Sequence, residues 1–183
     1  MSIASTLITA AEFARMPDPG HPQELFRGVV VNIPPPKLLH GHICGQIIFL
    51  LKTHAVANRL GRVFGNDSGI ITEQDPDTVR GADVSFISYA KLPQNASLNC
   101  YLTIAPDAVF EVLSLSDRWR DVLKKVSEYL LLGTPAVYVV DPDRTEVRCY
   151  FPDRAEEILS ATDEFSGIGP LADFRVPVAK FFE

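Results

Sequence analysis

Two apolar segments, Asp107-Ala-Val-Phe-Glu-Val-Leu113 and Ala136-Val-Tyr-Val-Val140, decide the fold of this 183-residue chain. Near-continuous apolar runs of this length are typical of strands that are buried on both faces of a sheet. Between them, Ser114-Leu-Ser-Asp117 has capping-box spacing and predicts a helix that runs to about Leu132. A crossover of this length makes the two strands parallel, and we expect them to be neighbours.

The flanking sequence predicts more helices and strands around this unit. Thr9-Ala-Ala-Glu12 has capping-box spacing, so a short helix is expected from about residue 10. The segment Glu24–Ile33 predicts two short strands around a tight Arg27-Gly28 turn. Apolar residues at helical spacing predict a helix over Leu38–Leu60. Strands are expected at Val63–Phe64, Gly69–Thr72, Ala82–Ile87 and Thr145–Phe151, with a loop over Glu73–Val79 and a docked tail over Val176–Phe182. The order predicts a mixed α/β (α+β) fold.

The composition is that of an ordinary globular chain. Hydrophobic residues are 46% and charged residues 22%, which is too apolar for disorder. No run approaches the roughly 20 apolar residues of a membrane span, and the first residues lack the basic start of a signal peptide. Cys44, Cys100 and Cys149 are odd in number and widely spaced, which excludes a disulfide framework or a Cys-based zinc site. We therefore expect a cytoplasmic protein with reduced thiols.

The net charge argues against a generally DNA-attracting surface. The 17 Lys and Arg residues stand against 23 Asp and Glu residues, which gives −6. Strong non-specific attraction to nucleic acid is therefore not expected from the whole molecule. A nucleic-acid partner would have to bind through a local basic face.

Two acids on neighbouring predicted strands are the first candidates for a site. Glu111 is the one charge within Ala108–Leu113, where an isolated carboxylate costs several kcal/mol unless it is paired, protonated or metal-bound. The structural alternative is a buried ion pair to Arg80 or Lys125. Asp83 begins a second apolar strand, and together the two carboxylates form the oxygen-rich set that Mg²⁺ prefers.

Two further charges are ambiguous from spacing alone. Lys125 lies at the edge of the apolar stripe of its helix, from which it can reach over the end of the sheet. The alternative is a surface pair with Asp121, four residues earlier, worth about 0.3–0.5 kcal/mol. Asp107 points to the same sheet face as Glu111, but a polar strand entry explains it at least as well.

Several segments of the chain have the order and spacing of a known family: Glu24–Val31, Pro36–His40, Arg80–Phe86, Pro106–Ser114, Arg120–Tyr129, Gly133–Pro142 and Phe174–Pro177. Together they resemble the Uma-type family of "putative restriction endonucleases", within the PD-(D/E)XK nuclease superfamily. The resemblance covers nearly the whole chain. It implies one nuclease-like domain over residues 1–183, with a restriction-endonuclease-like core, a mixed central sheet flanked by helices, and an N-terminal helix and hairpin.

The resemblance also implies the metal-binding residues. The strand aspartate of the family falls on Asp83 and its strand glutamate on Glu111, and these, with the backbone carbonyl of Val112, would hold Mg²⁺ or its substitute Mn²⁺. The superfamily lysine usually stands two residues after the glutamate, where this chain has Leu113. In this family the lysine falls on Lys125, where it would orient the attacking water or offset charge on the phosphorane.

Two more residues match positions near the family site. A glutamate near the N-terminus falls on Glu24, which would hold a second ion or a water molecule of the first. A histidine in the second helix falls on His40, although a polar residue at a helix start is more often a cap. We do not expect a His40–His42 metal pair, because residues two apart diverge on a helix.

The expected activity is endonucleolytic hydrolysis of DNA by a homodimer. A local basic face for DNA is expected from Arg118, Arg120, Lys124 and Lys125. The alternative is a solvated helix face paired with Asp117, Asp121 and Glu128. Two other functions stay open: a catalytically silent member that binds or assembles, and a hydrolase of a small phosphodiester. If Glu24, Asp83 and Glu111 converge, at least one carboxylate pKa should be raised without metal.

Overall fold

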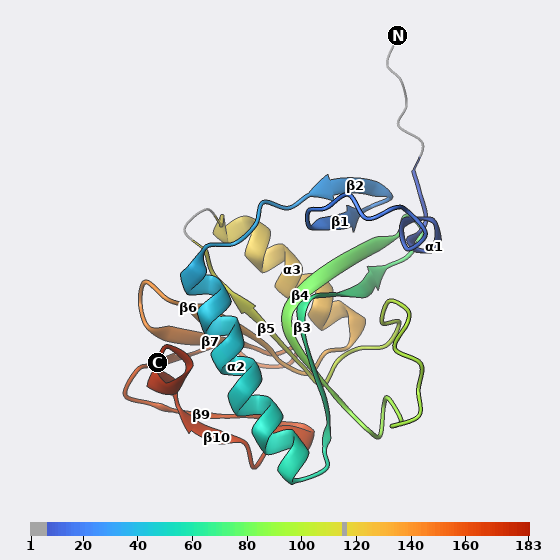
Figure 1. Cartoon of the computed structure of the whole chain (residues 1–183). Coiled ribbons are helices and arrows are strands. Elements are labelled where there is room, and N and C mark those ends of the chain that lie inside the picture. Colours follow the sequence, from blue (N-terminus) through green and yellow to red (C-terminus); the bar gives the residue numbers. More distant parts are fainter. Residues whose placement is uncertain (1–6, 115–116) are drawn as a thin grey trace.

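The structure is a computed structural model that describes residues 7–114 and 117–183, in which helices cover both faces of a central sheet (Figure 1). The elements of the first half are α1 (Ala10–Phe13), β1 (Gln23–Phe26), β2 (Val29–Asn32), α2 (Leu38–Ala57), β3 (Gly61–Glu73) and β4 (Thr78–Ser88). Those of the second half are β5 (Ala108–Val112), α3 (Trp119–Leu132), β6 (Val137–Asp141), β7 (Glu146–Tyr150), β8 (Glu157–Ser160), β9 (Glu164–Ser166), η1 (Gly169–Leu171), β10 (Arg175–Pro177) and η2 (Val178–Phe181).

Within the described residues the central sheet has eight strands and is mostly antiparallel. Seven of the strands follow the order β2-β1-β4-β5-β6-β7-β8. The eighth strand, β3, also pairs with β4. Strands β5 and β6 are the parallel pair in this sheet. They are neighbours joined by α3, as the sequence predicts. The mixed α/β fold with a helix-flanked sheet is thereby confirmed.

One face of the sheet packs against α2 and the C-terminal segment. Ile43, Ile47 and Leu51 on α2 are fully buried in the same apolar cluster as Phe110 of β5. The tail joins this cluster through β10 and η2, where Phe181 is buried, and Figure 1 shows these elements beside α2. The expected docking of the tail is confirmed.

The opposite face packs against α3. Val122, Val126 and Tyr129 form its buried stripe against the β5 and β6 residues Val109 and Val137. None of the helices in the described part of the chain has the length and apolarity needed to cross a bilayer.

The N-terminal elements form as predicted. Thr9 caps α1 in a capping box with Glu12, whose side chain accepts from the Thr9 backbone N–H at 2.8 Å. Strands β1 and β2 pair around a turn in which Arg27 has φ +48° and Gly28 has φ +76°. Two consecutive residues in this left-handed region suit the twist of a two-residue hairpin.

The expected interruption between two short strands at Val63–Phe64 and Gly69–Thr72 is wrong. Both belong to the single strand β3, which pairs with β4 almost throughout; the expected loop over 73–79 shrinks to a short turn. Asn66 and Asp67, which lie between the two expected strands, form an irregularity in β3 and have φ of +58° and +52°.

Two helix boundaries also differ from the prediction. Helix α2 ends at Ala57 rather than Leu60, because Arg59 takes a left-handed φ of +54°. Helix α3 begins at Trp119 with Arg118 as a cap that makes no side-chain hydrogen bond. Two positions of the expected capping box, 115–116, lie outside the described residues; Asp117 accepts from the Ser114 backbone N–H at 2.7 Å. Gly133, at φ +105°, ends α3 as predicted.

Candidate functional site

The site lies where β4 and β5 stop pairing. Their paired register ends at Val84 and Phe110. Asp83 stands one residue before Val84 on β4, and its carboxylate accepts a hydrogen bond from the Val112 backbone N–H at 2.6 Å. Asp83 Oδ2 thus takes the place of a strand carbonyl as the acceptor for the Val112 N–H. Its other oxygen, Oδ1, accepts no hydrogen bond from a backbone group of the described residues.

The strand on the other side of β4 is irregular at the same level. The register of β3 with β4 shifts between Gly65 and Ser68, which places Asp67 opposite the Asp83 region. A Cβ at position 81 would lie 2.7 Å from the Cβ of Asp67, so glycine at Gly81 permits this approach. Irregularities of this kind are common beside active sites. Burial and the nearby Asp83 raise the pKa of Asp67.

Glu111 is buried with one hydrogen-bond donor and one cation. The residue is 6% exposed. Its Oε1 accepts a hydrogen bond from the Tyr129 hydroxyl at 3.0 Å, and its Oε2 lies 3.4 Å from Lys125 Nζ. The buried contact of Glu111 with a cation that we considered as the structural alternative is therefore present, and the cation is Lys125 rather than Arg80.

Lys125 links two of the predicted acids. Its ammonium lies 3.0 Å from Glu24 Oε1 and 3.4 Å from Glu111 Oε2, and it donates to the Gly81 carbonyl at 3.5 Å. The alternative of a surface pair with Asp121 is wrong, because Asp121 pairs with Arg120 at 3.4 Å. The Lys125 side chain as a whole is 25% exposed.

The buried Arg80 holds the carboxylate of Glu24 in place. Arg80 Nη1 donates to Glu24 at 2.8 Å, while its Nε and Nη2 donate to the two carboxylate oxygens of Glu128 at 2.6 and 2.8 Å. The Gly81 backbone N–H adds a second hydrogen bond to Glu24, at 3.1 Å. The alternative in which Glu128 pairs on a solvated face of α3 is wrong for this residue: Glu128 is buried and pairs with Arg80 of β4.

His40 reaches the site from the other helix. It stands in the first turn of α2, and its Nε2 lies 3.3 Å from Asp83 Oδ1. Cys44, one helical turn later, brings its sulfur within 4.8 Å of the ligand atoms of both residues. His42 is exposed and takes no part, as its spacing predicts.

The packed charges displace several pKa values. Burial raises the pKa of Glu111 to about 8, as we expect for converging carboxylates. Burial opposes ionisation of Glu24 as well, but Lys125 and Arg80 outweigh it and lower the pKa of Glu24. For Lys125, burial is outweighed by Glu111 and Glu24, which raise its pKa. The hydrogen bond to Asp83 raises the pKa of His40 to about 11.

Asp107 lies outside this cluster, and so do three of the four residues of the expected basic face, Arg118, Arg120 and Lys124; the fourth, Lys125, lies within it. Asp107 accepts from the Ser88 backbone N–H at 2.7 Å and pairs with Lys91 at 3.1 Å, so it is the structural strand entry that we considered. On α3, Lys124 lies over the Phe26 ring at 3.5 Å. Arg118 and Arg120 are exposed near the start of the helix.

The structure thus brings together all of the predicted side chains, namely Glu24, His40, Asp83, Glu111 and Lys125. Sequence reasoning missed the roles of five others around them: Cys44, Asp67, Arg80, Glu128 and Tyr129. For two of these a signal existed. Arg80 is a charge in a strand that is buried throughout, and Glu128 adjoins the apolar stripe of α3.

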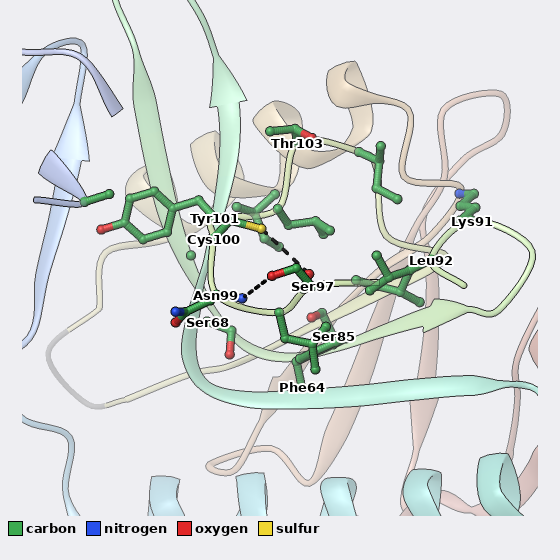
Figure 2. Close-up of a pocket in the computed structure, with 17 residues that line it drawn as sticks. Phe64, Ser68, Ser85, Lys91, Leu92, Ser97, Asn99, Cys100, Tyr101 and Thr103 are labelled. Atoms are coloured by element: carbon green, nitrogen blue, oxygen red, sulfur yellow. Dashed lines mark hydrogen bonds between the residues drawn. The ribbon is translucent and has the colours of Figure 1, made fainter. Parts of the chain in front are cut away.

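A separate pocket lies between the β3–β4 hairpin and the loop that follows β4. It has a volume of about 550 Å³, and Figure 2 shows Phe64 and Ser85 facing Cys100 and Tyr101 across it. None of the predicted site residues lines it. The carboxylate cluster is therefore distinct from this pocket.

Comparison with known proteins gives the family to which this fold belongs. The family described as "Uma2: Putative restriction endonuclease" matches residues 10–179, and the chain belongs to it. A crystal structure of "a putative nuclease belonging to DUF820 from Anabaena variabilis ATCC 29413" has the same fold, with a TM-score of 0.81. The two are 22% identical, over 96% of this chain and 97% of that one. No curated protein sequence matches the chain.

Proposed function

We propose that this chain is a metal-dependent endonuclease that hydrolyses phosphodiester bonds in DNA, acting as one nuclease-like domain over residues 1–183. The observation that carries the proposal is the meeting of three carboxylates from three strands, Glu24, Asp83 and Glu111, with Lys125 held between two of them. Such a cluster combines ligands for a hard cation with a fixed positive charge.

The donor set fits Mg²⁺, with Mn²⁺ as a substitute. Asp83 and Glu111 supply carboxylate oxygens, and the Val112 carbonyl supplies a third, because the N–H and C=O of one residue in an extended strand face the same side. The raised pKa of Glu111 means that this group ionises fully near neutral pH only when further positive charge is present. When bound, the ion would polarise the scissile phosphate and offset its negative charge.

The other residues of the cluster position and balance charge. Lys125, anchored by Glu24 and Glu111, would hold its ammonium toward the phosphate and orient the attacking water. Glu24 is fixed by Arg80, and this fixed carboxylate is suited to hold a water molecule or a second ion. His40 would fix the orientation of the Asp83 carboxylate.

The DNA would approach along the start of α3. Arg118, Arg120 and Lys124 lie on the same helix as Lys125 and would contact phosphates on either side of the scissile bond. With a net charge of −6, one copy of the chain has little general attraction for DNA. A homodimer would double the basic contacts and allow cleavage of both strands. We place the protein in the cytoplasm, where its free cysteines would stay reduced.

The test is cleavage of supercoiled plasmid with Mg²⁺ or Mn²⁺. We expect nicked and linear products from the wild type, and loss of both with Asp83→Ala or Glu111→Ala. Asp121→Asn is the matched control, because Asp121 is an exposed acid on α3 whose ion-pair partner among the described residues is the exposed Arg120. Cleavage that survives Asp83→Ala or Glu111→Ala would refute the proposal, as would activity that is unaffected by EDTA.

A catalytically silent binding or assembly module is the second candidate. The acidic balance favours it, as do the ion pairs that Glu24 and Glu111 already make with Lys125. A silent module should bind no divalent ion through Asp83 and Glu111, so calorimetric titration of the wild type and Asp83→Asn with Mn²⁺ separates the two. Cleavage of bis(p-nitrophenyl) phosphate without cleavage of DNA would instead favour a hydrolase of small phosphodiesters.

A further inference from the structure

A second set of possible metal ligands lies on the α2 side of Asp83. Helix α2 presents His40 and, one turn later, Cys44, and β4 presents Asp83 between them and the sheet. One ligand atom from each residue lies within 4.8 Å of the other two. The widely spaced cysteines exclude a site built from several thiols. They do not exclude one thiol brought to a histidine and an aspartate by the fold.

The spacing of the first two ligands suits a tetrahedral ion. Tetrahedral bonds of about 2.0–2.2 Å, as Zn²⁺ makes with nitrogen and oxygen, place two ligand atoms about 3.3–3.5 Å apart. His40 Nε2 and Asp83 Oδ1 are 3.3 Å apart. The octahedral bonds of Mg²⁺, at about 2.0–2.1 Å, require roughly 2.9 Å between neighbouring oxygens, and Mg²⁺ has little affinity for sulfur. The donor types and their spacing therefore favour Zn²⁺ over Mg²⁺ at this position.

The surroundings leave the ligands available to an ion. Nδ1 of His40 is buried without a hydrogen bond of normal geometry to any described residue, so no acceptor or donor there opposes the neutral tautomer that carries its proton on Nδ1 and offers the Nε2 lone pair to an ion. His40 also lines a pocket of about 190 Å³ between the start of α2, the start of α3 and the β6–β7 turn, which gives an ion a route to the imidazole. Cys44 is partly buried, so the residue is shielded from bulk solvent without being fully enclosed by protein. The mechanism proposed above makes no use of this thiol.

We propose that His40, Cys44 and Asp83 bind one thiophilic divalent ion, of which Zn²⁺ is the example, with a fourth position left to water. Three protein ligands with one open position is the arrangement of non-structural zinc sites. The ion takes its carboxylate ligand from Asp83, so it competes with Mg²⁺ for that residue. This competition, unlike the binding itself, rests on the proposed function: Zn²⁺ would inhibit Mg²⁺-dependent cleavage.

The binding is tested on the metal-free, full-length protein with Co²⁺ and Zn²⁺. A thiolate ligand gives Co²⁺ an intense charge-transfer absorption in the near ultraviolet, and tetrahedral coordination gives it visible bands; Zn²⁺ affinity is measured by competition with a chromophoric chelator. The variants are Cys44→Ser and the matched control Cys100→Ser, in which an exposed thiol remote from the site is replaced. Thermal unfolding of each variant shows that it is folded.

We expect one Co²⁺ per chain with a thiolate band in the wild type and in Cys100→Ser. In Cys44→Ser the band should vanish and Zn²⁺ affinity should fall by more than about tenfold, because loss of a direct ligand exceeds the smallest effects of outer-shell changes. A second variant, His40→Gln, should lower the Zn²⁺ affinity while Cys44 and the fold are retained. Absence of a thiolate band in the wild type, or equal Zn²⁺ affinity in Cys44→Ser, would overturn the site.

A cleavage assay separates this proposal from the proposed function. If Mg²⁺-dependent cleavage occurs, micromolar Zn²⁺ should inhibit the wild type and Cys100→Ser at least about tenfold more strongly than Cys44→Ser. Equal inhibition of all three would refute the competition. If no cleavage occurs with any metal, the proposed function fails, while the Co²⁺ and Zn²⁺ measurements still decide the binding site.

Discussion

Replacement of Glu111 by Gln should remove the pH dependence of stability that this carboxylate creates. Burial raises the pKa of Glu111 to about 8 from its ordinary value of 4.5. Between these two values the folded protein holds a proton on Glu111 that the unfolded chain has released. The free energy of unfolding of the metal-free protein therefore falls as pH rises through this window.

The magnitude follows from the width of the window. Each pH unit between the two pKa values is worth about 1.4 kcal/mol, so the total loss is at most about 5 kcal/mol. Glu111→Gln has no proton to lose, and its amide oxygen still accepts from the Tyr129 hydroxyl. His40, whose pKa is raised to about 11, also makes stability fall above pH 6.5. That contribution is common to both proteins and largely cancels in their difference.

The assay is urea unfolding in EDTA from pH 5 to pH 8.5, followed by the fluorescence of Trp119, the single tryptophan. Wild-type stability minus that of Glu111→Gln should fall by several kcal/mol across the series. A difference that stays constant within about 0.5 kcal/mol would show that Glu111 titrates normally, and would refute the buried, crowded carboxylate on which the metal site depends.

Three more predictions concern the buried arginine, the metal site and the oligomeric state. Glu128→Gln leaves the Arg80 guanidinium partly unpaired in a buried site and should lower the free energy of unfolding by about 2–4 kcal/mol in urea at pH 7; a loss below about 0.5 kcal/mol would contradict this. For a dissociation constant of ~1 mM, ~10 mM Mg²⁺ should stabilise the wild type by ~1.4 kcal/mol, or roughly 3–6 °C in Tm, and Asp83→Asn should lose most of this gain; an equal gain in both proteins would argue against Asp83 as a ligand. Light scattering at micromolar concentration should show a homodimer, and a monomer alone would disprove it.

Much of the fold was predictable because local signals agreed with the tertiary structure. The capping box at Thr9, the Arg27-Gly28 turn and the parallel pair of strands around α3 all appear as expected. The long β3–β4 hairpin was not predictable from periodicity, because Asn66 and Asp67 are turn-forming residues inside a strand. Pairing with the buried strand β4 outweighs their local preference.

The candidate site was predictable in its acids but not in its network. Glu111 and Asp83 are charges in apolar strands, which the sequence alone makes conspicuous. The pairing of Arg80 with both Glu24 and Glu128 joins β4, β1 and α3, and no local pattern specifies which of several acids an arginine will meet. Cys44 reaches the site only because α2 crosses the sheet beside Asp83.

The most direct test of the central claim is the anomalous scattering of Mn²⁺ in crystals of the metal-loaded protein. We predict a peak coordinated by carboxylate oxygens of both Asp83 and Glu111 and by the Val112 carbonyl. Lys125 should keep its contact with Glu24. A Mn²⁺-saturated crystal with no peak between Asp83 and Glu111, and with Glu111 still paired to Lys125 as in the metal-free protein, would contradict it.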